Sequence, residues 1–187
     1  MARSSTRKGK VRIDPKFYQS SMVQGSYFNR MLDCGPFNRM VEIALAYLPP
    51  RVLDEHKERL AFVCMAHRDG TRLAQRLRET REIIVLSEHG LPDYNSHEGQ
   101  RDFRYFIYIV LHETAHAIRK HRSPVYDSLD AREVEDQEKE ADELALQWFN
   151  DHIAARANPH LPPLTREEIA QAQARTQKIM LARIGGA

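Results

Sequence analysis

One apolar stretch decides the fold: YFIYIVLHETAHAI, residues 105–118. The seven residues before His112 are apolar on every side, and a soluble protein buries such a helix all round. His112, Glu113 and His116 then give the pattern H-E-x-x-H. Because a helix has about 3.6 residues per turn, residues 112 and 116 project from one face a single turn apart. Two imidazoles placed in this way can share one metal ion, while Glu113, one step round the helix, can meet a water beside it.

Burial of these three ionisable groups predicts a partner for them. An unpaired charge in a protein interior is costly, and a divalent cation satisfies all three groups at once. The alternative is two ordinary histidines near a helix end, hydrogen-bonded to backbone or to carboxylates. The buried context favours the metal site, and the ligand types favour zinc.

A third protein ligand is expected from the following helix. Asp130 and Glu133 form a capping pair, which predicts a helix from there to about Ala155. Glu138 shares its apolar stripe and points at the core, while Asp142, one turn later, can accept the second ring N–H of a ligating histidine. The stripe itself holds Val134, Ala141, Ala145, Trp148 and His152. The other acids of this helix fall on its flanks or opposite face, where we expect solvated charge: Glu133, Glu135, Glu140 and Glu143.

The pattern His112-Glu113-x-x-His116 followed by Glu138-x-x-x-Asp142 resembles the gluzincin branch of zinc metallopeptidases. Residues 138–145, EKEADELA, are also similar to the Glu-x-x-Ala-(Asn/Asp)-x-Phe-Ala segment of small ImmA/IrrE-type peptidases, with leucine where phenylalanine is usual. The resemblance covers roughly residues 60–155. It implies an α+β, zincin-like fold in which a small sheet packs on the H-E-x-x-H helix and on a second helix that bears the glutamate, with additional flanking helices. It also implies Zn²⁺ held by His112, His116 and Glu138, with Asp142 orienting a histidine.

Two other H-E-x-x-H families fit less well. A metzincin-like site needs Gly and His three and six residues after the second histidine, where this chain has Arg119 and Arg122. A deformylase-like site takes an upstream cysteine, but Cys64 lies in an apolar segment and is expected to be a core thiol. His121 is off register for a ligand, and we expect it to interact with free carbonyls at the helix end.

These residues predict a zinc-dependent endopeptidase. Three protein ligands leave a fourth position for a water whose pKa falls to about 7, and Glu113 would take its proton and return it to the leaving amine. Tyr126, between the two helices, is the first candidate for stabilising the oxyanion and His97 the second. The alternative is a metal-stabilised, catalytically silent regulator that binds a protein or DNA partner. A third possibility is a helical scaffold without metal.

The pattern of residues 71–77 is ambiguous, although a strand there would fit the resembled fold. Strands are predicted at residues 60–66 and at residues 81–88 (REIIVLSE). If the last of these lies at an edge, it can bind extended substrate by strand addition, whereas an interior strand would have no such role. Residues 89–101 predict a loop that leads into the H-E-x-x-H helix. Flanking helices are expected at residues 37–48 and 52–59, and after Thr165.

Length and composition limit the domain organisation, the partners and the localisation of the protein. With 187 residues and 42% hydrophobic content, we expect one domain at residues 13–187 after a flexible basic arm at residues 1–12. A net charge of +2 implies no global attraction for nucleic acid or membrane, although the arm can touch phosphates weakly. Two cysteines without a pairing pattern, and no apolar run of membrane-span or signal type, predict a cytoplasmic protein that acts on a peptide or protein substrate. No feature predicts an oligomeric state.

Overall fold

The computed structural model describes six segments of the chain: residues 35–65, 70–73, 82–87, 97–124, 127–156 and 162–184. The expected basic arm, residues 1–12, lies outside them. In chain order the helices and strands are α2 (Gly35–Leu45), α3 (Pro50–His56), β1 (Leu60–Met65), β2 (Gly70–Leu73), β3 (Glu82–Ser87), α4 (His97–Arg119), α5 (Ala131–Ala155) and α6 (Arg166–Ile184). The expectation of an α+β fold is confirmed.

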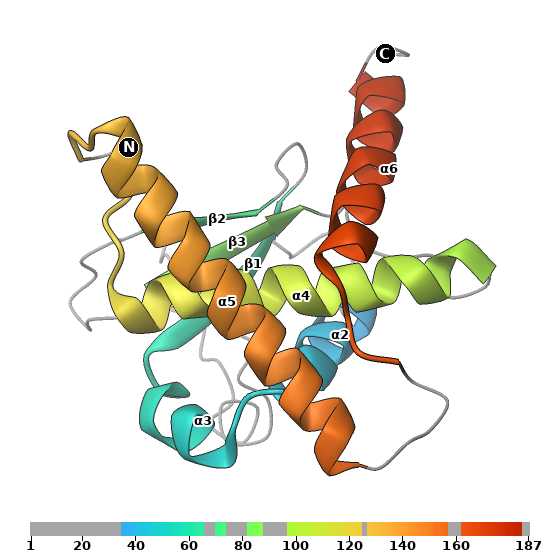
Figure 1. Ribbon diagram of the computed structural model, residues 1–187, viewed down its shortest axis with the longest axis horizontal. Coiled ribbons are helices and arrows are strands. Elements are labelled where there is room, and N and C mark those ends of the chain that lie inside the picture. The colour runs from blue at the N-terminus through green and yellow to red at the C-terminus, as the bar shows by residue number, and fades with distance from the viewer. Residues whose placement is uncertain are drawn as a thin grey trace, which may run out of the picture.

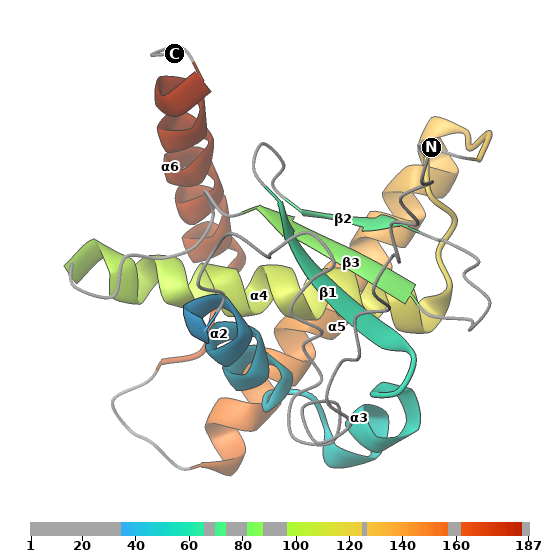
Figure 2. The same cartoon turned by 180° about the vertical axis from the view of Figure 1, so that it is seen from behind.

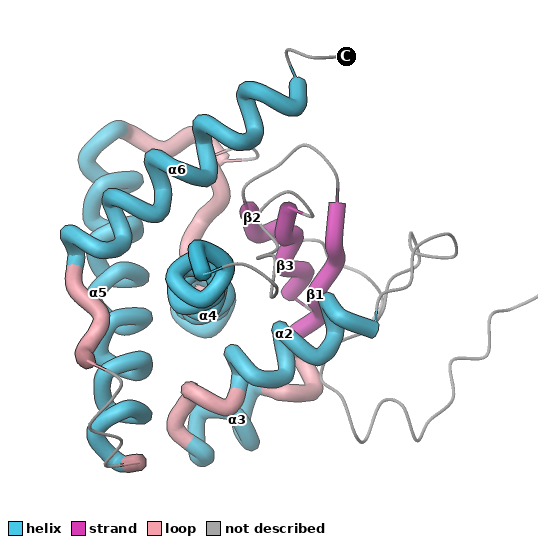
Figure 3. Tube along the Cα trace, turned by 90° about the vertical axis from the view of Figure 1, so that its right-hand side faces the viewer, coloured by secondary structure: helices cyan, strands magenta, loops and turns pink. Residues whose placement is uncertain are grey.

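Helix α4 is the centre of the molecule. It contacts α5, α2, α6 and the strands β2 and β3. Figure 1 shows α5 crossing in front of α4, and Figure 2 shows the sheet and α2 on the opposite face of α4. In Figure 3, which looks along α4, the helix lies between α5 on one side and the sheet on the other. The apolar stretch of α4 is therefore covered on several faces, as its sequence predicts.

The core forms where these layers meet. Phe106 and Leu111 of α4, Phe149 of α5, and Phe62 of β1 are almost completely buried in one cluster. Helix α2 adds its own apolar face, with Val41 among the fully buried residues. Burial of this much apolar surface fixes how α4 sits between its neighbours.

The sheet has the strand order β1-β3-β2, with β1 parallel and β2 antiparallel to β3. Strand β3 is therefore central: Ile84 faces Phe62 of β1 and Arg72 of β2. The hypothesis that residues 81–88 form an edge strand that binds substrate is wrong. Side chains alternate between the two faces of a strand, so the burial of Ile84, Val85 and Leu86 agrees with the unbroken apolar run in the sequence.

Helix α4 begins earlier than the sequence suggests. Residues 97–101, expected to be loop, form its first turns, while residues 89–96 lie outside the described segments. The residues that follow are tied to α6: Arg104 donates to both carboxylate oxygens of Glu168, at 2.7 and 3.2 Å, and Arg175 lies 3.4 Å from Asp102. A bidentate arginine–carboxylate pair thus joins the first half of α4 to α6.

Helix α5 begins where its sequence predicts. Asp130 accepts a hydrogen bond from the Glu133 backbone N–H at 2.8 Å, and the Glu133 carboxylate accepts from the Asp130 N–H at 3.1 Å. This reciprocal capping satisfies two otherwise free donors of the first turn.

Small residues line the contact between α4 and α5. Ala115 on α4, and Ala141 and Ala145 on α5, are fully buried in the common core. Side chains of this size let two helix backbones approach closely.

Among the described residues, no helix is both long enough and apolar enough to cross a membrane.

Replacing Ala141 by leucine should force α4 and α5 apart. The new side chain has no space in this contact, so we expect unfolding in urea to show a loss of about 1–3 kcal/mol. Ala154→Leu makes the same change at an exposed position of α5 and should leave stability nearly unchanged. If Ala141→Leu is as stable as the wild type, the helices are not closely packed there.

Candidate metal centre

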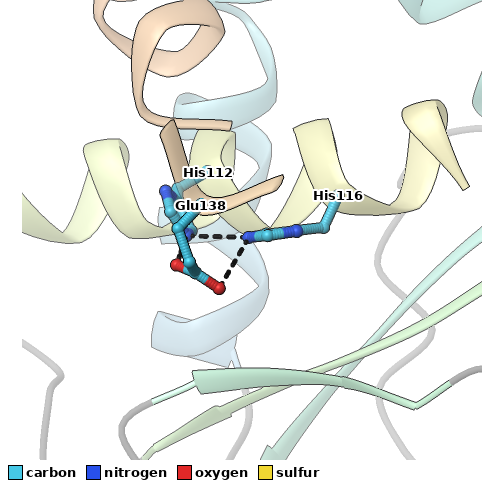
Figure 4. A group of neighbouring side chains, drawn as sticks. All are labelled: His112, His116 and Glu138. Atoms are coloured by element: carbon cyan, nitrogen blue, oxygen red, sulfur yellow. Dashed lines mark hydrogen bonds and ion pairs between the residues drawn. The ribbon is translucent and has the colours of Figure 1, made fainter. Parts of the chain in front are cut away.

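Three side chains expected to bind a metal converge on one point. The structure brings together His112 and His116 from α4 and Glu138 from α5, with one potential ligand atom of each within 4.8 Å of the others. The two Nε2 atoms are 3.0 Å apart, and Glu138 lies 3.3 Å from His112 Nε2 and 3.5 Å from His116 Nε2. Figure 4 shows the three side chains directed at one another.

These separations fit a tetrahedral ion. With ligand bonds of about 2.0–2.1 Å, zinc holds neighbouring ligand atoms about 3.3–3.4 Å apart. The Nε2–Nε2 distance of 3.0 Å lies near that value, as do the distances of 3.3 Å from His112 Nε2 to Glu138 Oε2 and 3.5 Å from His116 Nε2 to Glu138 Oε1. Two imidazole nitrogens and a carboxylate are also a donor set that zinc favours. The residues present therefore fit a zinc ion.

Burial is uneven across the site. The side chains of His112 and His116 are 14% and 12% exposed, whereas that of Glu138 is 53% exposed. The expectation that Glu138 points into the core needs correction, because it reaches the histidines from the solvent side. The buried part of α5 begins only at Ala141, one turn further on. The site is thus covered on the α4 side and accessible beside Glu138.

Asp142 lies against the outer nitrogen of His112. Its Oδ1 is 3.0 Å from His112 Nδ1, within ion-pair distance although not aligned as a hydrogen bond. The buried Tyr108 donates its hydroxyl hydrogen to the same oxygen. Asp142 is thereby held between a phenol and an imidazole, at the place where the sequence expects a carboxylate that orients a histidine.

The charges of the site stabilise one another. Burial alone lowers the pKa of His112, but the carboxylates of Asp142 and Glu138 together outweigh it and raise this pKa to about 9. In return, hydrogen bonds from His112 and His116 hold the pKa of Glu138 well below its usual range. A positive charge is favoured where the three side chains meet, because the carboxylates face it in a partly dehydrated environment.

The sequence missed the partners of His116. His121 does not interact with helix-end carbonyls through its ring as expected: its Nδ1 lies 2.9 Å from His116 Nδ1, and its Nε2 lies 3.0 Å from Glu140 Oε2. Glu140 is partly exposed, as expected, but it is also paired, because Arg119 lies 2.9 Å from its other oxygen. Lys120, the residue after α4, has a backbone φ of 58°, and the chain reverses its direction there. Helical periodicity could not reveal this, because His121 lies beyond the helix.

Four other residues were considered for the site in the sequence: Glu113, His97, Tyr126 and Cys64. Glu113 is half-buried, and its charge contributes to the raised pKa of His112. His97 is the first residue of α4, about 22 Å along the helix from His112 at 1.5 Å per residue, so its assignment as oxyanion donor is wrong. Tyr126 and the side chain of Cys64 lie outside what the structure describes.

A comparison with protein families finds a match that includes the candidate metal site. Residues 105–184 match the sequence model of the family Peptidase U49. The match contains the H-E-x-x-H segment of α4 and all of α5 and α6. No curated protein and no solved structure matches the chain. The family match supports a peptidase that acts on peptide or protein substrates.

In protein stripped of metal by a chelator, stability should fall as the pH rises from 6.5 through about 9. The pKa of His112 is higher in the folded chain, about 9, than its ordinary value of 6.5. Its contribution is therefore complete below pH 6.5 and is lost above pH 9, a change on the order of 3 kcal/mol. Urea unfolding at several pH values measures it.

His112→Gln should flatten that pH dependence, because the titrating group is removed. His56→Gln, on α3 and away from the site, is the control and should keep the wild-type profile. An unchanged profile in His112→Gln would show that another group titrates.

Proposed function

We propose that the protein is a zinc-dependent endopeptidase of gluzincin type, with His112, His116 and Glu138 as the metal ligands. The observation that carries the proposal is the approach of these three side chains at separations suited to a tetrahedral ion. The match to Peptidase U49 supports peptide-bond hydrolysis independently of that geometry. A zincin-like arrangement is consistent with the sheet and α5 lying on opposite sides of α4.

When bound, zinc supplies a Lewis acid that polarises a carbonyl and lowers the pKa of water. Glu113 acts as the general base: it accepts a proton from the attacking water and passes it to the departing amine. Asp142 would keep the proton of His112 on Nδ1, which leaves the Nε2 lone pair available to the metal. Tyr126, in the connection between α4 and α5, remains the candidate for donating a hydrogen bond to the oxyanion.

Substrate binding by strand addition would use β2 rather than β3. Both edges of β3 are occupied, whereas in the described part of the sheet β2 pairs on one side only. Strand β2 also contacts α4. An extended peptide that adds to the open edge of β2 would be held through backbone hydrogen bonds, with little dependence on its side chains.

The competing hypothesis is a regulator that keeps the metal but has no activity. The peptidase family match disfavours it, and replacement of the proposed base separates the two. We place the protein in the cytoplasm because its two cysteines lack a pairing pattern.

Glu113→Gln should bind zinc with unchanged stoichiometry and lose proteolytic activity by a factor of about 10² or more, because the amide cannot accept the proton. Cleavage of a peptide library and elemental analysis measure the two properties. Glu143→Gln makes the same change at an exposed position of α5 and should keep both. Undiminished proteolysis in Glu113→Gln would refute the assigned base.

Glu138→Ala should weaken zinc binding by more than about 100-fold, since loss of a direct ligand exceeds the effect of losing an outer hydrogen bond. Competition with a chelator gives the affinity. Glu135→Ala, at an exposed position one turn away, should bind zinc as the wild type does. If Glu138→Ala retains full affinity, the ligand must instead be Glu135 or Asp142.

A further inference from the structure

Each histidine of the H-E-x-x-H segment has a second ring nitrogen that needs a partner. For His112 that partner is the carboxylate of Asp142, at 3.0 Å. For His116 it is another imidazole: His121 Nδ1 lies 2.9 Å from His116 Nδ1, and the rings meet edge to face. His121 is only 8% exposed and reaches Glu140 Oε2 through its own Nε2 at 3.0 Å. His116 therefore contacts a carboxylate of α5 indirectly, through a buried ring.

The contacts assign the protons of both rings. A carboxylate can only accept, so His121 donates from Nε2 to Glu140. In neutral His121 the other nitrogen, Nδ1, is then an acceptor, and the facing Nδ1 of His116 must donate to it. With zinc bound, His116 would then present its lone pair on Nε2, the atom that lies 3.0 Å from His112 Nε2 and 3.5 Å from Glu138.

We propose that His121 and Glu140 form a positioning relay that fixes the tautomer and orientation of His116. The relay rests on the proposed zinc site, because it prepares His116 Nε2 as a ligand atom. Neither residue touches substrate or the reacting atoms. Both act through His116, as Asp142 acts through His112.

The surrounding contacts hold the relay in place. The turn at Lys120 brings the His121 backbone N–H to within 3.0 Å of the His116 carbonyl oxygen. Arg119 occupies the second oxygen of Glu140 at 2.9 Å, which leaves Oε2 to His121. Gln137 accepts a hydrogen bond from the Arg122 backbone N–H at 2.6 Å and so ties the segment after α4 to α5. The position of His121 is thus set by backbone and side-chain bonds on both sides.

The relay gives α5 a threefold role. Glu138 approaches both histidines directly, Asp142 lies behind His112, and Glu140 lies behind His116 through His121. These acids alternate along the segment EKEAD, residues 138–142. One helix therefore supplies the proposed ligand and the anchors of both histidines.

The test is the zinc affinity of the full-length protein, measured by competition with a chelator. His121→Phe keeps a ring but cannot accept the hydrogen bond from His116 or donate one to Glu140. This variant should bind zinc about 10–100-fold more weakly. His121→Gln should recover most of that loss, because its amide oxygen can accept from His116 while its amide nitrogen donates to Glu140. Such recovery would not follow from a role in packing alone. The visible spectrum of the cobalt-substituted protein should change in His121→Phe and return towards the wild type in His121→Gln.

A second pair of variants makes the test independent of how His121→Phe folds. Glu140→Ala should also weaken zinc binding, whereas Glu143→Ala, the same change at an exposed position of α5, should not. Urea unfolding of each metal-free variant shows whether the fold is kept. Wild-type zinc affinity in both His121→Phe and Glu140→Ala would overturn the relay while leaving the proposed zinc site intact. Failure of the wild type itself to bind zinc would overturn both.

Discussion

The packing of α4 against α5 is the contact on which the rest of the site depends. The helices are far enough apart in sequence that only tertiary structure brings Glu138 to His112 and His116. Buried alanines on both helices allow this approach, and the capping box at Asp130 stabilises the start of α5. An error of one residue in the register of α5 would rotate Glu138 by about 100° away from the histidines.

Electrostatics and burial favour the same arrangement. The histidines are nearly covered by the core, while Glu138 stands at the solvent side, so the site has a rigid base and an accessible rim. Carboxylates from α5 surround the imidazoles and raise the pKa of His112. Burying such a cluster without a cation or a proton would be unfavourable, since neighbouring charges are screened little in a partly dehydrated environment. The fold therefore retains the polar cluster at a place where positive charge is stabilised.

The other layers hold α4 in position. The sheet and α2 cover its apolar face, and α6 clamps its amino-terminal half through Arg104 and Glu168. Strand β3, placed between β1 and β2, is part of this support rather than an edge open to substrate. Strand β2, whose open edge is proposed to receive a peptide, belongs to the same sheet and also contacts α4.

Local patterns were enough to predict several features of this protein. Helical spacing placed His112 and His116 on one face, the Asp130–Glu133 pair placed the start of α5, and the apolar stripe of α5 singled out Glu138. Each depends on residues within a few turns of one another, whose relative positions are set by the geometry of a helix.

Only the tertiary structure decided the features that depend on distant contacts. The order of strands in the sheet placed β3 at its centre, and ion pairs joined the first half of α4 to α6. The reversal of the chain at Lys120 brought His121 and Glu140 together behind His116. These outcomes are set by how separate elements pack and by one left-handed backbone turn at a lysine, where no glycine marks it, so no local periodicity in the sequence encodes them.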